Sequence, residues 1–373
     1  MWNKLKFLNS QIRGYKTSRK IVVIESDDWG AERIPSKRVQ QELENKGIDI
    51  KQNPHSRYDI LEREDDFNAL YEVLHKINQE FIDKKPVLTA NFIMANPDFD
   101  RIKEARFQEY HYEQFSDTYA KKDRNNSTEK MLYDGIKNGF IKPQFHGREH
   151  INVLTWLDLL KKNNLDFRNA FDLNCYAIDS KTLDENKSNL MASYDYTMQE
   201  GKAFVDKSIV EGLSLFKNFF GYDSDTTVAP RYVWNNDIED IFKKNGVNLM
   251  QTAVVQKKST LGNYTDIWHH TGEKKNKMYF SVRNAHFEPA YNSKTDWIKQ
   301  VMGKAKIAFL LRTPLIISTH RLNFVGGLCE KNRSSNLKQF HLLLSSLIKE
   351  YPNIEFMTSE GITKIMKNEF TVR

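Results

Sequence analysis

The sequence has little of several residue types, and each shortage excludes a class of protein. Only two of its 373 residues are cysteines, Cys175 and Cys329, which are too few for a disulfide scaffold or a cysteine zinc cluster. With 9 prolines, 16 glycines and 39% hydrophobic residues, the chain is neither collagen-like nor wholly disordered. No apolar run approaches the roughly 18–20 residues that a membrane helix requires. We therefore expect a globular protein without an integral membrane segment.

Acidic residues are in the minority. The 49 aspartates and glutamates stand against 56 lysines and arginines, which gives a formal net charge of +7. The basic residues are spread along the chain and interleaved with acids, as in residues 121–124 (Lys-Lys-Asp-Arg). No helix-turn-helix pattern, zinc-finger spacing or basic tail accompanies them. We expect no nucleic-acid partner, whereas an anionic ligand is compatible with this charge.

The basic segment 1–20 does not resemble a secretory signal. It lacks the apolar core of roughly 7–15 residues and the small-residue cleavage site of a signal peptide. Its best apolar run, from Leu5 to Leu8, is interrupted by Lys6. We therefore expect a cytoplasmic protein.

Short apolar, β-branched segments alternate with longer amphipathic segments along the chain. The expected strands are residues 20–25, 86–93, 141–145, 226–228, 249–255, 278–282, 314–319 and 354–358. The clearest expected helices are residues 66–81, 155–163, 198–220 and 336–350. This alternation is typical of parallel strands joined by crossover helices. It predicts an α/β fold with a single (β/α) barrel over residues 20–373, an N-terminal extension at 1–19 and an insertion near 98–130.

Polar residues follow six of the expected strands. In chain order they are Asp27 and Asp28, Asn91 and Asn96, the segment from His146 to His150, Arg231, Asn284 and His286, and His320. In a parallel barrel the carboxyl ends of the strands share one mouth, where the chemistry of such folds lies. The sequence therefore places its candidate site at that mouth.

Two histidines four residues apart, His146 and His150, indicate a metal site. If the chain turns into a helix after His146, the two rings lie on one face and can share an ion. Asp27 and Asp28 end a buried strand, where adjacent carboxylates are costly unless a cation or hydrogen bonds stabilise them. Two acids after a strand also occur as a helix N-cap. Together the two pairs predict a divalent metal held by histidine and aspartate.

Four segments resemble, in chain order, the motifs of metal-dependent polysaccharide deacetylases, the carbohydrate esterases with a NodB homology domain. They are 26–30 (Ser-Asp-Asp-Trp-Gly), against a strand ending in Asp-Asp-Gly; 146–150 (His-Gly-Arg-Glu-His), against His-Ser-x-x-His; 229–232 (Ala-Pro-Arg-Tyr), against an Arg-Pro-Pro-Tyr-like strand end; and 316–320 (Ile-Ile-Ser-Thr-His), against a histidine after an apolar strand. The sequence departs from these motifs by the inserted Trp29, by Gly147 in place of serine and by an arginine that follows the proline.

The resemblance implies a fold, a metal and a set of roles. The fold would be a distorted TIM-like barrel with seven strands. The metal, zinc before cobalt or nickel, would be held by Asp28, His146 and His150. Asp27 would be the general base that activates water, oriented by Arg231, and His320 would protonate the leaving group. The implied activity is hydrolytic removal of an N- or O-linked acetyl group from a carbohydrate.

Four residues near these motifs are candidates for binding a sugar. They are Trp29, Tyr232, Trp234 and His286. Sugar rings stack on aromatic faces, although core packing explains aromatic residues equally well. We expect the partner to be an acetylated sugar, an oligosaccharide or a surface-glycan precursor carried on a nucleotide or lipid, whose diphosphate would suit the basic balance of the chain.

Two other functions fit the same barrel. A glycoside hydrolase would use a pair of carboxylates, for which Glu25, Glu149 and Glu288 lie near expected strand ends. Such an enzyme would work after metal removal, whereas the deacetylase would not. A non-catalytic barrel that binds glycan is the second alternative.

Overall fold

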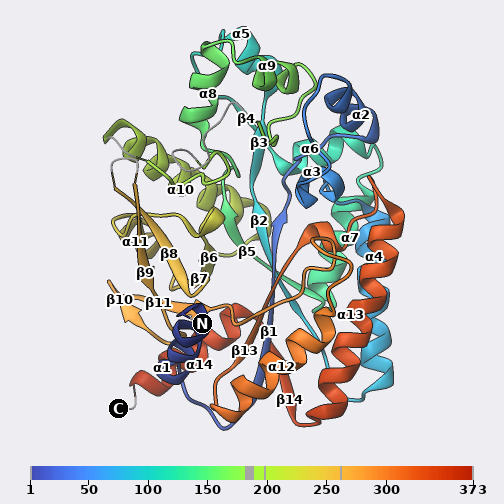
Figure 1. Cartoon of the computed structure of the whole chain (residues 1–373), viewed down its shortest axis with the longest axis vertical. Coiled ribbons are helices and arrows are strands. Elements are labelled where there is room, and N and C mark those ends of the chain that lie inside the picture. The colour runs from blue at the N-terminus through green and yellow to red at the C-terminus, as the bar shows by residue number, and fades with distance from the viewer. Residues whose placement is uncertain (1, 181–188, 197–198, 261–262, 372–373) are drawn as a thin grey trace.

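The computed structural model describes residues 2–180, 189–196, 199–260 and 263–371. Within them strands and helices alternate, and Figure 1 shows a curled sheet at the centre of the molecule with helices around it. The expected α/β fold is therefore confirmed. No helix in these ranges combines the length and the apolar character that crossing a lipid bilayer requires.

The main sheet has ten strands within the described residues, so the expected count of seven is wrong. In spatial order they are β10 (Lys274–Lys275), β11 (Met278–Val282), β7 (Leu249–Thr252), β6 (Thr226–Val228), β5 (Ile141–Gly147), β2 (Leu88–Ile93), β1 (Lys20–Trp29), β13 (Leu315–His320) and β12 (Ala285–His286), with β14 (Ile354–Met357) also paired to β1. The pairing is parallel except between β10 and β11. The carboxyl ends of the parallel strands therefore meet at one edge.

The segment that contains β11 and β12 pairs with two different strands of this sheet, β7 and β13. β11 pairs with β7, and β12, which begins three residues after β11 ends, pairs with β13. Between them the Arg283 amide donates to the Thr252 carbonyl (2.9 Å) and the Asn284 amide donates to the Ile316 carbonyl (3.0 Å). The segment 278–286 thus bridges β7 and β13 and carries Arg283 to the carboxyl edge.

The central strand β1 is buried on both faces, which explains its continuous apolar sequence. Val22 and Ile24 belong to the large core that lies between the sheet and the surrounding helices. Ile21 and Val23 belong to a second core, which also contains Met366 from α14 (Ser359–Thr371). This alternation follows from the period of two in a strand. Strand β1 therefore holds its carboxyl end rigidly between β2 and β13.

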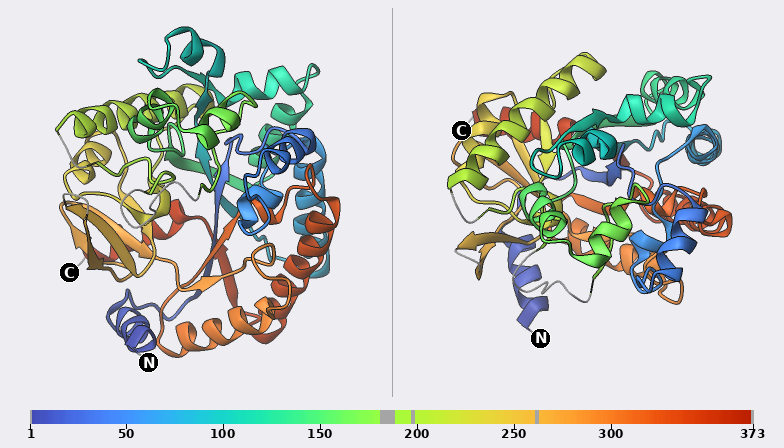
Figure 2. Two further views of the ribbon diagram at one scale, coloured as in Figure 1. Left: turned by 45° about the horizontal axis from the view of Figure 1, so that its top comes forward. Right: turned by 90° about the horizontal axis from the view of Figure 1, so that it is seen from above.

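The helices cover the outside of the sheet. Figure 1 shows α4, α7 and α13 beside one another along one side, and the view from above in Figure 2 shows helices around the strands. The helices not yet given bounds are α1 (Trp2–Arg13), α2 (Lys37–Asn45), α3 (Pro54–Tyr58), α4 (Glu64–Glu80), α5 (Phe99–Glu104), α6 (Phe115–Lys122), α7 (Ser127–Lys137), α8 (Val153–Lys161), α9 (Leu165–Phe171), α10 (Gln199–Phe220), α11 (Ile238–Lys244), α12 (Trp297–Leu310) and α13 (Glu330–Glu350), with 3-10 turns η1 (Pro230–Tyr232) and η2 (Arg321–Asn323). The four expected helices correspond to α4, α8, α10 and α13.

Two short hairpins complete the fold. β3 (Ala95–Pro97) pairs with β4 (Tyr112–Gln114), and β8 (Val255–Thr260) pairs with β9 (Asn263–Trp268). The segment 98–130, expected as an insertion, holds α5, β4, α6 and the start of α7. Phe115 of this segment is buried in the main core, so the segment packs as part of the fold.

Candidate metal centre

Two adjacent aspartates end β1, and both line a large cavity at the carboxyl edge of the sheet. Consecutive residues of a regular strand point to opposite faces. Asp28, however, has a φ of 77°, in the left-handed region, and this interrupts the alternation. Asp27 and Asp28 therefore border the same cavity, whose volume is about 1130 Å³. Their side chains are buried, so each carboxylate needs a partner.

The structure brings His146 and His150 to Asp28. Their Nε2 atoms lie 3.4 and 3.2 Å from the same oxygen, Oδ1 of Asp28, and all three side chains are buried. The condition of a helix after His146 is not met. Instead β5 runs on through Gly147, which has a φ of 144°, and the chain then bends at residues 148–151. A Cβ at Gly147 would lie 3.1 Å from the Glu149 carbonyl oxygen, so glycine allows this tight bend.

The ring nitrogens nearest Asp28 are suited to bind a metal. His146 Nδ1 lies 2.9 Å from the Val228 carbonyl oxygen, which assigns the proton to Nδ1 and a lone pair to Nε2. Burial lowers the pKa of His150 to about 4, so this ring is neutral at pH 7. Oδ1 of Asp28 is buried and has no hydrogen-bond partner among the described residues. Two imidazole nitrogens that converge on one carboxylate oxygen fit a divalent cation, and this set of ligand types suits zinc and its neighbours.

A second group of potential ligands shares Asp28 but fits a metal less well. Asp28, His55 and His320 also offer ligand atoms within 4.8 Å of one another. The other oxygen of Asp28, Oδ2, lies 3.1 Å from Nη2 of Arg33, and Nδ1 of His320 lies 2.7 Å from Glu288. A guanidinium beside the site repels a cation. The group formed by Asp28, His146 and His150 is therefore the better metal site.

Asp27 is held by Arg283. Nη1 and Nη2 of Arg283 donate to the two carboxylate oxygens at 2.5 and 2.7 Å, and Nδ2 of Asn91 donates to Oδ1 at 2.7 Å. Nε of Arg283 donates to Glu25 at 2.7 Å. Burial raises the pKa of Asp27, but the Arg283 guanidinium lowers it by more, to well below its usual range. Asp27 is therefore ionised at neutral pH and can accept a proton.

Arg231, expected to orient Asp27, lies elsewhere on the cavity wall. Its backbone is left-handed, with a φ of 60°, and the next residue, Tyr232, has a φ of 56°. The Arg231 side chain is exposed and lines the cavity. The arginine that binds Asp27 in the structure is Arg283. This corrects the expectation from the sequence.

His320 lies beside Asp27 and is backed by an acid. The two residues are register partners in the parallel pair of β1 and β13. Nδ1 of His320 lies 2.7 Å from Oε1 of Glu288, whose Oε2 accepts from Asn323 at 2.7 Å. Burial lowers the pKa of His320, but Glu288 raises it by more, to about 9. His320 is therefore protonated at pH 7 and can donate a proton.

Two of the four expected sugar-binding residues line the cavity. Tyr232 and His286 both border it, and the Tyr232 hydroxyl accepts from Nη1 of Arg283 at 2.9 Å. Tyr291 and Trp297 add further aromatic side chains to the lining. The cavity therefore offers rings on which a sugar could stack.

The two expected tryptophans lie in the core instead. Trp29 is 1% exposed, stacks on Phe67 and donates from its indole nitrogen to Ser26. Trp234 is 0% exposed and donates from its indole nitrogen to Glu239. Neither residue lines the cavity. Their proximity in sequence to the site therefore does not place their rings in it, and this corrects the expectation.

The carboxylates considered for a glycoside hydrolase are engaged elsewhere. Glu149 accepts from Arg148 at 2.5 Å and from Ser208 at 2.9 Å, and it does not line the cavity. Glu25, bonded to Arg283, does not line it either. Of these three glutamates only Glu288 borders the cavity. A pair of free glutamates facing a substrate is therefore not formed by them.

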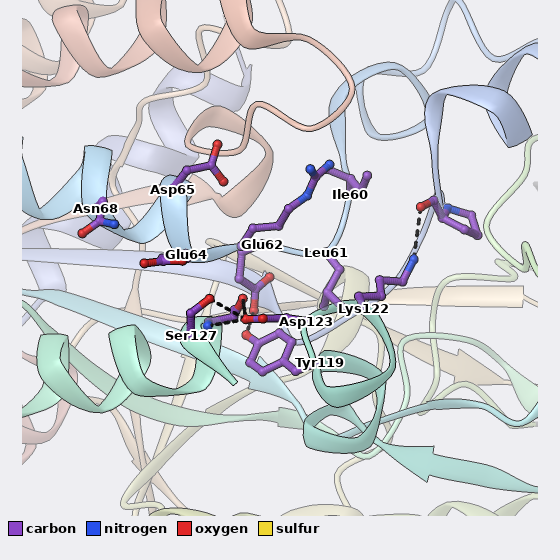
Figure 3. Close-up of a pocket in the computed structure, with 13 residues that line it drawn as sticks. Ile60, Leu61, Glu62, Glu64, Asp65, Asn68, Tyr119, Lys122, Asp123 and Ser127 are labelled. Atoms are coloured by element: carbon purple, nitrogen blue, oxygen red, sulfur yellow. Dashed lines mark hydrogen bonds between the residues drawn. The ribbon is translucent and has the colours of Figure 1, made fainter. Parts of the chain in front are cut away.

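A second, smaller hollow of about 410 Å³ lies beside the start of α4 and α7 (Figure 3). No histidine is among its lining residues. Glu62 at its floor is hydrogen-bonded to Tyr119, and Asp123 accepts from Ser127 and Thr128 at the start of α7. These carboxylates stabilise the fold, so the candidate site is the larger cavity.

Several residues of the site were missed by sequence reasoning. Arg283 directly follows the apolar segment 278–282, a position that could have indicated it. Arg33 binds Asp28, and His55 lies 2.8 Å from the Tyr291 hydroxyl. These last residues lie in loops or short helices, where the sequence carries no periodic signal.

Comparison with known proteins gives only distant structural likenesses. No family model and no curated protein matches the chain. A probable polysaccharide deacetylase from Pseudomonas aeruginosa PAO1 is similar with a TM-score of 0.47 at 8% identity, covering 93% of this chain and 90% of that one. Puue allantoinase is similar with a TM-score of 0.44 at 10% identity, over 94% of this chain and 91% of that one.

A 4-alpha-glucanotransferase from Thermococcus litoralis is similar with a TM-score of 0.43 at 9% identity. The likeness covers 92% of this chain, which spans only 40% of that protein. Likenesses of this size do not identify an activity. The function is therefore argued from the geometry of the site.

Proposed function

We propose that this protein is a metal-dependent hydrolase that removes an acetyl group, N- or O-linked, from a carbohydrate. The observation that carries the proposal is the environment of Asp28. Its buried Oδ1 lacks a hydrogen bond within the described residues and lies 3.2–3.4 Å from the Nε2 atoms of His146 and His150. An ionised acid and a protonated histidine stand beside this group, as acyl hydrolysis requires.

Asp28, His146 and His150 would hold the metal. A divalent ion at this position would lower the pKa of a bound water and polarise the acyl oxygen. Asp27, kept ionised by Arg283, accepts the proton of the attacking water. His320 donates a proton to the departing nitrogen or oxygen, and Glu288 keeps it charged. Base and acid are adjacent because β1 and β13 pair in register.

A carbohydrate substrate is supported by the cavity. Its volume of about 1130 Å³ could hold more than one sugar ring, and Tyr232, Tyr291 and Trp297 line it. Polar side chains such as Gln300 line it as well. Aromatic faces beside hydrogen-bonding groups suit sugars, which have apolar C–H faces and polar edges. Within the same proposal, the metal is zinc.

The first test is the metal content of the purified, untagged protein by elemental mass spectrometry. We expect about one divalent ion per chain, lost in His146→Ala. His286→Ala is the matched control, because this histidine lines the same cavity outside the ligand group. Absence of metal from the wild type after incubation with zinc, cobalt or nickel would refute the proposal.

The second test is acetate release from acetylated sugars by the metal-loaded protein. Asp27→Asn should retain the metal and lose acetate release, because Asp27 lies outside the ligand group. A non-catalytic binding barrel would release no acetate in the wild type. A glycoside hydrolase would retain its activity after chelation, so either result would replace the present proposal.

A further inference from the structure

Arg231 has an unusual position in the cavity wall. It belongs to η1, directly after β6, and both Arg231 and Tyr232 have left-handed backbones with φ values of 60° and 56°. The backbone of residues other than glycine is strained in this region, and such strain is concentrated at functional sites. The strained turn keeps Arg231 exposed along the lining of the cavity that contains Asp28.

Three of the four described carboxylates that border the cavity have a basic partner other than Arg231, and the fourth, Asp179, is exposed. Asp27 is bound by Arg283, Glu288 by His320, and Asp28 by Arg33 on one oxygen. Among the described residues no carboxylate forms an ion pair with Arg231. With respect to the described residues, the Arg231 guanidinium lines the cavity with its donors available to a ligand.

With a divalent ion bound, the charge of the cavity would favour an anion. Among the described residues, the cationic side chains that border the cavity, histidines aside, are Arg33, Arg231 and Lys304, and the carboxylates are Asp27, Asp28, Asp179 and Glu288. A bound divalent ion would turn this near balance into a net positive charge. A substrate with a negative group would then be attracted to the cavity.

We propose that Arg231 binds an anionic oxyacid group, a phosphate ester in the first place, carried by the sugar substrate. This inference rests on the proposed function, since it assumes that the acyl group lies at Asp28, His146 and His150. The planar guanidinium can donate two parallel hydrogen bonds to a phosphate or a carboxylate, which an ammonium cannot. Arg231 would thus determine which acetylated sugars are accepted, and neutral sugars would bind more weakly.

The test is calorimetric titration of the metal-loaded protein with sugars that carry no acyl group, so that no hydrolysis occurs. The probes are glucose 1-phosphate, glucose 6-phosphate, glucuronate and inorganic phosphate, with methyl glucoside as the neutral reference. We expect a phosphorylated probe to bind more tightly than methyl glucoside. Arg231→Gln should weaken that binding about ten- to a hundredfold, the usual effect of losing hydrogen bonds to a charged group, and leave methyl glucoside unchanged.

Arg312→Gln is the matched control. Arg312 is also exposed and also has a left-handed backbone, with a φ of 56°, but it does not line the cavity. Its substitution should change the binding of no probe. If glucuronate is the one probe that binds more tightly than methyl glucoside in an Arg231-dependent way, the inference is supported and the anion is a carboxylate. Equal loss in both variants, or no Arg231-dependent binding of any anionic probe, would overturn it.

The two proposals can fail separately. Titration of the chelated protein measures the anion site without the metal. If Arg231-dependent binding persists there while the wild type neither holds metal nor releases acetate, the hydrolase proposal fails and the anion site stands. If metal content and acetate release are as expected but Arg231→Gln binds every probe like the wild type, the inference about Arg231 fails alone.

Discussion

Arg283→Met is expected to destabilise the protein more than any surface substitution. The Arg283 side chain is 0% exposed and donates to Asp27, Glu25 and Gln251. Methionine keeps much of the apolar volume of the side chain but removes all of these donors. Two buried carboxylates, Glu25 and Asp27, would then remain without their cation.

The size of the effect follows from the burial of these charges. Breaking a buried ion pair by removing one partner costs about 3–5 kcal/mol, because the other charge stays buried and unpaired. The free energy of unfolding of globular proteins is about 5–15 kcal/mol, so we expect the variant still to fold. Its melting temperature should be lower than that of the wild type by on the order of 10 °C. Adding Glu25→Gln removes one of the unpaired charges and should restore on the order of 1–3 kcal/mol.

The assay is urea unfolding of the wild type, both single variants and the double variant, all metal-free and in one buffer. Acetate release by the metal-loaded variants is measured in parallel. Arg283→Met should retain metal, because Arg283 binds Asp27 rather than Asp28, and should lose most of its activity. A loss of stability under about 1 kcal/mol, or no recovery on adding Glu25→Gln, would refute the reasoning.

Three further predictions concern the same site. Glu288→Gln should lower the pKa of His320 from about 9 toward its ordinary value. In the pH–rate profile, the decline of activity at high pH should then begin at a lower pH than in the wild type. An unchanged profile would exclude His320 as the proton donor. Zinc at about a thousand times its Kd should raise the free energy of unfolding of the wild type by about 4 kcal/mol, and that of His146→Ala by much less. Thermal unfolding measures both values. Equal increases in the two proteins would contradict the ligand set. Trp234→Phe should cost about 1–2 kcal/mol of stability through the lost bond to Glu239 and leave KM unchanged in an acetate-release assay; a raised KM would return Trp234 to the substrate site.

The fold could be predicted largely from local sequence because its strands are short, buried and apolar. Segments 226–228 and 278–282 were expected with the bounds that β6 and β11 have. The strand count was not predictable in the same way. β12 contains only two residues, and β10 is two lysines, so neither has an apolar signature. Pairing of one chain segment with both β7 and β13 is a long-range property that no local pattern carries.

The convergence of Asp28, His146 and His150 was predictable because parallel strands end at a common edge. The side-chain directions were not. Trp29 follows Asp28 directly in sequence, yet its ring packs in the core. Arg231 has a left-handed backbone and lines the cavity, whereas Asp27 is paired with Arg283. Backbone conformation at single residues decided these cases, and a lone sequence gives little warning of it.

The network behind Asp28 bears on how the site could use a metal. Oδ2 of Asp28 is 3.1 Å from Nη2 of Arg33, whose Nε is 3.1 Å from Asp59, which Arg321 binds at 2.6 Å. All four side chains are buried and their charges alternate, so turning Oδ2 away would cost Arg33 one of the two carboxylates that it contacts. While this contact with Arg33 is kept, Asp28 offers Oδ1 to a cation, beside the two histidines. An ion held by these three ligands would keep positions for water and substrate, whereas structural zinc sites have four protein ligands, so this set would suit a catalytic ion.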